Sequence, residues 1–218
     1  AFGFGKERRS VILCLTASSN ILMRMVSIAL NPDLPAAVRQ YLRARLSNRR
    51  YLHSELAASF SAGLAIRYGL DQDKAFLAGL AHDAARELPG EAILSLADGS
   101  GFPLTEEERA NPILAHGKAA AAILRETFGI GDPDLLEAVV CHTTGAPGMG
   151  ALARVVFCAD YLTPGRSYVS DGFRSALTAL PLDRMTCRVT AAMIAYNLTR
   201  GKRISGATTA LYSELCGQ

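Results

Sequence analysis

Two neighbouring polar residues, His82 and Asp83, interrupt an apolar segment at residues 77–88, and any fold of this chain has to accommodate them. A buried ionised carboxylate is costly without a partner, and metal coordination is one of the few arrangements that offset this cost. Histidine, the residue beside it, is the commonest metal ligand in proteins. The pair therefore predicts a metal site that other parts of the chain must complete.

The remaining three histidines also occur in segments where apolar residues recur at helical spacing. His53 shares a face with Phe60, His142 lies seven residues after Leu135, and His116 comes near the start of a predicted helix. Each of them alone would be explained as an ordinary core, capping or turn residue, but their shared setting favours one common site. With the carboxylate that ends the apolar segment 152–160, the candidate ligands are His53, His82, Asp83, His116, His142 and Asp160.

This ligand set predicts two metal ions rather than one. Four imidazoles and two carboxylates are too many for a tetrahedral zinc ion and suit two five- or six-coordinate divalent ions, between which Asp83 could form a bridge. Adjacent residues diverge by about 100° on an ideal helix, so His82 and Asp83 can share a site only near a helix end. Two such ions activate a shared water and hold both oxygens of a phosphoryl displacement.

Outside this cluster the chain reads as helix throughout, and no segment shows the alternation typical of a half-buried strand. Half of the residues are hydrophobic but only 7% are aromatic, a composition that suits close-packed helices. Pro89 is expected to end the helix that carries His82, and a long amphipathic helix is expected at 182–200 with a shorter one at 207–215. Helix caps are predicted at Ser47 or Asn48, Asp71, Thr105 with Glu108, and Asp132 before Pro133. The fold is therefore predicted to be all-α.

Residues 1–30 do not continue this pattern and are expected to form an N-terminal extension of a single domain at 31–218. Basic residues precede an apolar stretch at 11–23, whose length suits a signal peptide and is too short to span a bilayer comfortably. Polar residues interrupt the stretch, however, and no convincing cleavage site follows. A natural translation start at Met23 or Met25 is the favoured explanation.

Charge and cysteine content narrow the choice of partners and compartment. The net charge of +3 is too small to indicate nucleic-acid binding and would suit an anionic small substrate; the arginines at residues 39–50 are mostly interpreted as a solvated helix face. The five cysteines are odd in number and form no CxxC, which favours free thiols in the reducing cytoplasm. Cys141 and Cys158 are expected to be core residues rather than ligands.

The order His53, His82-Asp83, Asp160 resembles the H…HD…D pattern of the HD-superfamily metal-dependent phosphohydrolases. Further segments sharpen this likeness, at residues 50–55, 78–86, 116–117, 142–149 and 159–166. Together they are similar to the bacterial symmetrical bis(5'-nucleosyl)-tetraphosphatases, the YqeK group, over about residues 34–200. The resemblance implies an HD-domain helical bundle with the metal site between its core helices. It also implies two divalent ions, with iron favoured over manganese or cobalt.

Roles for individual residues follow from the same resemblance. It implies that His53, His82, Asp83 and Asp160 hold one ion and that Asp83, His116 and His142 hold the other. Catalysis is assigned to Asp83 and Arg86, and substrate contacts to Arg86, Thr143 and Arg166. Arg86 and Arg154 stand where the family usually has lysine, and both keep the positive charge.

The implied activity is symmetrical cleavage of diadenosine tetraphosphate into two ADP by a hydroxide that the two metals activate. One alternative is the same chemistry on another nucleotide, such as a nucleoside monophosphate, a cyclic nucleotide or an alarmone. The other is a non-catalytic nucleotide-sensing module, against which the presence of all six ligands argues. The expected partner is a small dinucleoside polyphosphate, with neither nucleic acid nor a membrane; the expected location is the cytoplasm, and a homodimer is compatible with the sequence.

Overall fold

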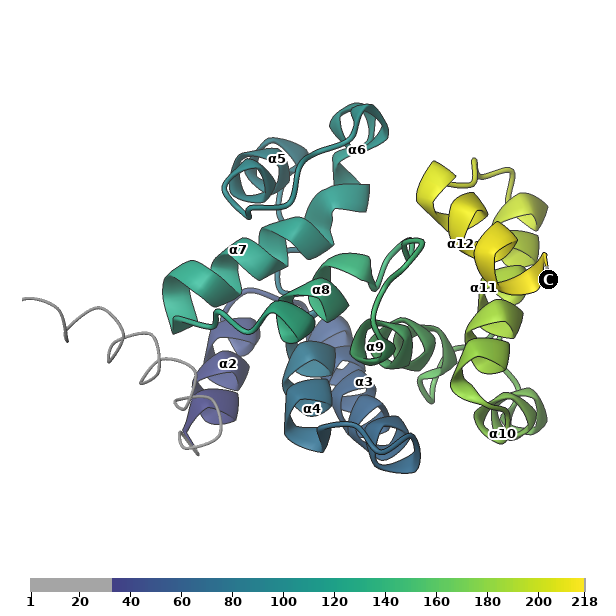
Figure 1. The fold of residues 1–218 in the computed structure, drawn as a ribbon. Coiled ribbons are helices and arrows are strands. Elements are labelled where there is room, and N and C mark those ends of the chain that lie inside the picture. The colour runs from purple at the N-terminus through teal and green to yellow at the C-terminus, as the bar shows by residue number, and fades with distance from the viewer. Residues whose placement is uncertain (1–32, 218) are drawn as a thin grey trace, which may run out of the picture.

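The structure, a computed structural model, describes residues 33–217. These residues form helices and no strand, which confirms the predicted all-α fold (Figure 1). The elements in chain order are α2 (Leu34–Arg43), α3 (Asn48–Arg67), α4 (Gln72–Ala81), α5 (Gly90–Asp98), α6 (Glu106–Ala110), the 3-10 helix η1 (Pro112–Ala115), α7 (His116–Phe128), α8 (Pro133–Cys141), α9 (Ala151–Leu162), α10 (Asp171–Thr178), α11 (Leu182–Thr199) and α12 (Gly206–Cys216).

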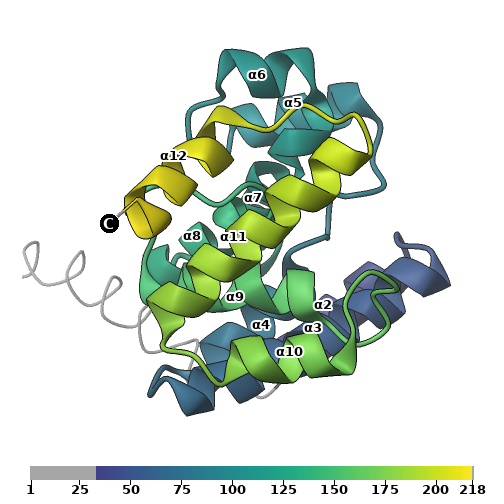
Figure 2. The same ribbon diagram turned by 90° about the vertical axis from the view of Figure 1, so that its right-hand side faces the viewer.

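Helices α3, α4, α8 and α9 form the centre of the bundle and pack against one another. On one side α7 packs against both α5 and α8, and on the other α11 packs against α9 (Figures 1 and 2). The core between them consists mostly of small and aliphatic side chains, and its most deeply buried aromatic residue, Phe157, is 1% exposed. Burial of this apolar surface stabilises the bundle and fixes the positions of the helix ends around its centre.

Two glycines allow the central helices to approach one another closely. A Cβ atom on Gly79 of α4 would lie 2.9 Å from the carbonyl oxygen of Ala57 on α3. A Cβ atom on Gly117 of α7 would lie 2.7 Å from the carbonyl oxygen of Val139 on α8. Only a residue without a side chain fits such approaches. Each glycine lies within three residues of a cluster histidine, so both approaches help to bring the histidines together.

The predicted helix starts are confirmed. Each capping side chain accepts a hydrogen bond from a backbone amide in the first turn and so satisfies a donor that the helix itself leaves free. The caps are Ser47 for α3, Asp71 for α4, Thr105 for α6 and Asp132 for α8. In α6, Glu108 returns the bond to the backbone of Thr105, which completes the capping box.

The helix that carries His82 ends earlier than predicted. α4 ends at Ala81, and Pro89 stands instead at the N-cap of α5. Between them the backbone amide of Ala84 donates to the carbonyl oxygen of Ala81, and that of Arg86 to the carbonyl oxygen of Asp83. These bonds span three residues instead of four and tighten the chain into turns. His82 and Asp83 thus lie just past a helix end, where both can face one site.

One helix and one disulfide were not predicted. α10 (Asp171–Thr178) begins at Ser170, whose side chain caps it. Cys187 of α11 is bonded to Cys216 of α12, so the prediction that all the cysteines are free thiols is wrong for this pair. The two residues are 29 positions apart and meet only because α12 folds back along α11 (Figure 2). Cys141 and Cys158 are free and buried, as predicted.

Within residues 33–217 no helix is both long and apolar enough to cross a membrane. The predicted extension at residues 1–30 lies outside the described residues, and so do Met23 and Met25, the predicted translation starts. Cys14 lies outside them as well.

Candidate metal centre

Five segments bring the six candidate ligands together in the middle of the bundle. Three histidines occupy helix ends: His82 follows α4, His116 opens α7 and His142 follows α8. His53 lies on α3 and Asp160 on α9. The structure therefore brings all the sequence-predicted ligands to one place, although the five segments that carry them are far apart along the chain.

The same type of hydrogen bond orients each of the three helix-end histidines. In each, the Nδ1 atom donates to the carbonyl oxygen three residues earlier: Gly79 for His82 at 2.7 Å, Ile113 for His116 at 2.6 Å and Val139 for His142 at 2.7 Å. A histidine that donates from Nδ1 presents an unprotonated Nε2 as an electron-pair donor. The three Nε2 atoms are thus turned toward the cluster in the tautomer that a metal ion requires.

The two oxygens of Asp83 face the two halves of the cluster. Oδ1 lies 3.1 Å from Nε2 of His116 and 3.8 Å from Nε2 of His142. Oδ2 lies 3.3 Å from Nε2 of His82 and 3.9 Å from Nε2 of His53. A carboxylate in this position can share its oxygens between two cations.

Asp160 completes the half that contains His53 and His82. Its Oδ1 atom lies 2.8 Å from Nε2 of His53 and 3.5 Å from Nε2 of His82. His53, His82 and Asp160 form one group of atoms close enough to hold an ion, and His82, Asp83 and His142 form a second. His82 belongs to both groups, so its Nε2 atom lies between the two halves.

The two carboxylates of the cluster stay ionised despite their burial and stabilise positive charge beside them. Burial raises the pKa of the Asp83 carboxyl, but the charge of His82 and a hydrogen bond with His116 outweigh burial and hold that pKa well below its usual value. The pKa of the Asp160 carboxyl is also held well below its usual value, because the charge of Arg166 and a hydrogen bond with His53 outweigh burial. Burial lowers the pKa of His82, yet the two carboxylates raise it to about 10. The carboxylates that favour a proton at Nε2 also favour a metal ion there.

The other half shows the opposite behaviour. Burial and the neighbouring His116 lower the pKa of His142 to about 3, so its imidazole is neutral near neutral pH. Nε2 of His116 and Nε2 of His142 are 2.9 Å apart, while the Nδ1 atom of each donates to a carbonyl oxygen. Two ring nitrogens at this distance need a proton or a metal ion between or beside them, because their lone pairs would otherwise repel each other.

These observations test whether the residues fit a pair of divalent cations. The Nε2 atom of His82 is buried and has no hydrogen-bond partner among the described residues, a cost that coordination would remove. The set combines imidazole nitrogens with carboxylate oxygens, the donors that iron, manganese and cobalt accept. The side chains therefore fit two such ions.

Arginines surround the cluster, and one of them was misinterpreted from the sequence. Arg50, treated there with a solvated helix face, donates from Nη1 to Oδ2 of Asp83 at 2.7 Å. It lies one helical turn before His53 on α3, a spacing that already places both on one face. Arg166 donates to the carboxylate of Asp160 and lies 3.1 Å from Nε2 of His53. Both arginines therefore hold a candidate ligand in position.

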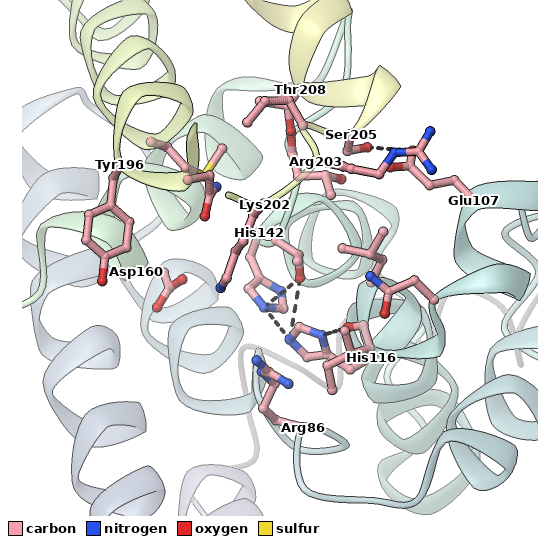
Figure 3. A pocket seen from close by; sticks show the side chains of 18 of the residues that line it. Arg86, Glu107, His116, His142, Asp160, Tyr196, Lys202, Arg203, Ser205 and Thr208 are labelled. Carbon is pink, nitrogen blue, oxygen red and sulfur yellow. Dashed lines mark hydrogen bonds between the residues drawn. The ribbon is translucent and has the colours of Figure 1, made fainter. Parts of the chain in front are cut away.

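The cluster opens into a cavity of about 1080 Å³ that contains the remaining sequence-predicted site residues. Arg86, Thr143 and Arg166 all line it. Figure 3 shows Arg86 on the cavity wall. The hydroxyl oxygen of Thr143 lies 3.1 Å from Nε2 of His142. Arg86 has no ion-pair partner among residues 33–217, and burial lowers the pKa of its guanidinium, partly offset by the charge of Asp83. A half-buried cation of this kind calls for an anion in the cavity.

Arg154, the second position where the family usually has lysine, lies elsewhere. Its guanidinium pairs with Asp183 and with Glu214, and it is not among the cavity residues. It connects α9 with α11 and α12 and so has a structural part in the fold.

Several cavity residues were not found from the sequence. They come from the C-terminal part of the chain, for which the sequence predicted two helices but no functional residue: Tyr196, Asn197, Lys202, Arg203 and Thr208. Tyr196 stacks on Tyr168 with ring centroids 4.4 Å apart, an arrangement that no sequence pattern announces because 28 residues separate the two rings.

Comparison with known proteins agrees with this geometry. The fold and the site define the class of the protein as an all-α hydrolase with histidine and aspartate side chains gathered between its core helices. More particularly, the chain belongs to the HD domain family, because the model of that family matches residues 50–165, which is more than half of the chain.

Two curated relatives have the same name, symmetrical bis(5'-nucleosyl)-tetraphosphatase. The protein from Bacillus subtilis is 32% identical over 127 residues, which is 58% of this chain and 68% of the relative. The protein from Halalkalibacterium halodurans is 33% identical over 135 residues, which is 59% of this chain and 68% of the relative. The resemblance seen in the sequence motifs is thus confirmed.

A solved structure extends the likeness to the fold. It is described as a "predicted HD superfamily hydrolase involved in NAD metabolism" from Clostridium acetobutylicum. The TM-score is 0.75 at 31% identity, and the match covers 84% of this chain and 96% of the other. The helical bundle described above is therefore shared almost throughout.

Proposed function

We propose that this protein is a metal-dependent hydrolase that cleaves diadenosine tetraphosphate symmetrically into two ADP. The observation that carries the proposal is the position of Asp83, whose two oxygens face two separate groups of histidines in a cavity that several arginines also line. A pair of divalent ions next to an anion-binding cavity suits hydrolysis of a phosphoric anhydride. The curated relatives from two bacteria support the particular substrate by their names.

The proposed ligands are the six side chains already described. His53, His82, Asp83 and Asp160 would hold one ion, and Asp83, His116 and His142 the other. Two bound divalent ions would supply an activated water and neutralise charge on the phosphate groups. Iron is the ion we propose, with manganese and cobalt as substitutes that the same donors accept.

The chain's own residues would orient the substrate and balance its charge. Arg86 is an unpaired cation on the cavity wall and would contact the phosphate that leaves with one ADP. A guanidinium can hold two phosphate oxygens at once, which orients the group as well as neutralising it. Thr143 lies beside two ligand nitrogens and would donate its hydroxyl hydrogen to a phosphate oxygen bound there.

Arg166 would act on both sides of the site. It pairs with Asp160 and lies next to His53, so it holds these two ligands in orientation. It also lines the cavity, where its remaining donors can meet a phosphate group.

The size of the cavity supports a substrate larger than a mononucleotide. At about 1080 Å³ it exceeds the usual range for sites that bind one small molecule. Tyr168 and Tyr196, whose rings stack, line it together with Ile113 and Leu114, so the cavity offers apolar surfaces to nucleoside groups.

The decisive experiment combines metal reconstitution with product analysis. Metal-free protein is loaded anaerobically with Fe²⁺, Mn²⁺ or Co²⁺ and incubated with diadenosine tri-, tetra- and pentaphosphate, and the products are separated by anion exchange. We expect ADP as the sole product from the tetraphosphate. Equal amounts of AMP and ATP would show asymmetrical cleavage instead. Binding without turnover under every metal would favour a nucleotide-sensing module.

The cytoplasmic location and a homodimeric state stay predictions. Buried free thiols at Cys141 and Cys158 suit a reducing compartment, whereas the Cys187–Cys216 bond suits an oxidising one. Cell fractionation followed by thiol trapping decides between them. Light scattering during size-exclusion chromatography gives the mass of the assembly.

A further inference from the structure

We propose that Lys202, in the connection between α11 and α12, is a phosphate-binding residue that selects substrates by the length of their phosphate chain. This inference rests on the proposed function, because it concerns the same cavity. It adds a residue outside the part of the chain that the HD domain match covers, which ends at residue 165.

Lys202 is a cation without a partner in the cavity. Its side chain lines the cavity and points into it, as Figure 3 shows. Throughout the part of the chain that the structure describes, no carboxylate lies within ion-pair distance of its ammonium group. Arg50 and Arg166, in contrast, are already paired with Asp83 and Asp160. The positive charge of Lys202 is therefore available to a bound anion.

The backbone at Lys202 is held by a helix-end motif rather than left as a free loop. The amide of Lys202 donates to the carbonyl oxygen of Asn197 at 3.0 Å, and the amide of Gly201 donates to that of Leu198 at 3.0 Å. Gly201 has a φ of 65°, in the left-handed region that favours glycine. These three features define a Schellman motif at the end of α11, with Lys202 as the residue just beyond the left-handed glycine.

The other end of the connection is attached to α6. Glu107 accepts hydrogen bonds from the hydroxyl of Ser205 at 3.0 Å and from the backbone amide of Gly206 at 3.2 Å. Residues 202–204 are thus held between the end of α11 and the start of α12, across the cavity from the turn that carries Arg86 (Figure 3). A lysine on such a support loses less freedom on binding than one on a flexible loop.

The position of Lys202 determines what it can recognise. The metal cluster and Arg86 lie on one wall, and Lys202 reaches in from another. We expect a single phosphate at the candidate ligands to be held by them and by Arg86. A chain of several phosphates would extend further through the cavity, where Lys202 could neutralise the additional groups. Lys202 would therefore increase the affinity for polyphosphates more than for orthophosphate.

The test uses inorganic phosphates as probes, so that it does not depend on turnover. Binding of tripolyphosphate and of orthophosphate to the metal-loaded protein is measured by titration calorimetry. For Lys202→Ala we expect tripolyphosphate affinity to fall about tenfold, as for loss of one charge-assisted hydrogen bond, with orthophosphate affinity unchanged. Lys202→Arg should restore most of the lost affinity. Metal content and Tm of each variant serve to exclude misfolding.

Two further variants separate charge in the cavity from charge in general. Arg188→Ala removes one positive charge from the exposed face of α11, the helix that precedes Lys202, at a residue that does not line the cavity, and should change neither affinity. Gly201→Ala keeps the lysine but strains the left-handed position, so it should weaken tripolyphosphate binding alone.

The outcomes distinguish this inference from the proposed function. Unchanged tripolyphosphate binding in Lys202→Ala, an equal loss in Arg188→Ala, or no tripolyphosphate binding by the wild type would each overturn the inference. If the wild type hydrolyses no dinucleoside polyphosphate and yet shows the expected pattern of binding, the proposed activity fails and the anion site stands. If hydrolysis is found, Lys202→Ala should raise KM for diadenosine tetraphosphate about tenfold with kcat little changed.

Discussion

At the scale of single residues, the candidate centre depends on orientation as much as on residue type. The carbonyl oxygens of Gly79, Ile113 and Val139 determine which nitrogen of each helix-end histidine faces the cluster. Arg50 and Arg166 orient the two carboxylates in the same way. Such supporting contacts make ligand geometry, and hence metal affinity, sensitive to residues that never touch a metal.

Asp83 is the residue whose loss should affect both ions. Asp83→Asn removes the anion whose oxygens face both halves of the cluster. The variant, purified in the presence of metal in the same way as the wild type, should therefore contain neither ion and show no activity. Metal content per chain, determined by inductively coupled plasma mass spectrometry, measures this directly. Retention of one ion per chain would show that the bridge is not essential.

Arg86 should behave differently because it is assigned to the substrate. Arg86→Ala should keep the metals but lower kcat/KM by a factor that corresponds to about 2–4 kcal/mol of lost transition-state stabilisation. This loss is expected if the contact between Arg86 and the leaving phosphate strengthens as charge develops there. Arg86→Lys should recover part of the loss, since the family usually has lysine there. Either metal loss in Arg86→Ala or its full activity would contradict the division of roles between Arg86 and Asp83.

At the scale of helices, the distances in the cluster are set by close backbone approaches. Gly117→Ala would bring a Cβ atom to 2.7 Å from the carbonyl oxygen of Val139 and force α7 away from α8. We expect the half of the centre with His116 and His142 to bind metal more weakly, and Tm to fall. Gly131→Ala is the matched control, because no atom lies within 4 Å of the added Cβ.

The disulfide between Cys187 and Cys216 holds the C-terminal helix α12 against α11. A cross-link of 29 residues stabilises the folded state by about 3–4 kcal/mol through lost freedom of the unfolded chain. Reduction with dithiothreitol should therefore lower the Tm of the wild type. The same treatment of the Cys187→Ser, Cys216→Ser double variant should change nothing, and a drop there would mean that the reductant acts elsewhere.

At the scale of the whole molecule, one cavity collects residues from nearly the full length of the described chain, from Arg50 to Thr208. α12 closes it from outside: the hydroxyl of Thr208 donates to the carbonyl oxygen of Thr144, and Leu211 packs against Gly145, where a Cβ atom would meet its side chain at 2.4 Å. The segment after His142 is therefore positioned by a helix more than sixty residues away, which couples the C-terminal region to the centre.

The N-terminal region should be dispensable by comparison. Residues 1–24 contain no candidate ligand, and their apolar stretch does not continue the amphipathic pattern. Deleting them should leave metal content and kcat nearly unchanged, with both measured beside the full chain. Insoluble or inactive truncated protein would show that this region is part of the domain core.

Local chemistry explains what could be predicted from the sequence. A cap such as Asp71 bonds to amides two and three residues away, and helical spacing reports which side of a segment is buried, so the all-α fold and the inward positions of the histidines follow from neighbours along the chain. The pair His82-Asp83 predicted a shared site because burying an isolated carboxylate is costly at any location.

Interactions between distant segments decided the rest. The ion pair of Arg50 with Asp83, the bond between Cys187 and Cys216, and the direction of Lys202 each depend on how separate helices meet. The end of α4 at Ala81 also depends on such contacts. The tight turns after Ala81 direct His82 and Asp83 toward candidate ligands on other helices. Residue types and their spacing along the chain therefore predicted the candidate ligands, whereas packing between helices determined which charged side chains contact them and which have no ion-pair partner in the cavity among the described residues.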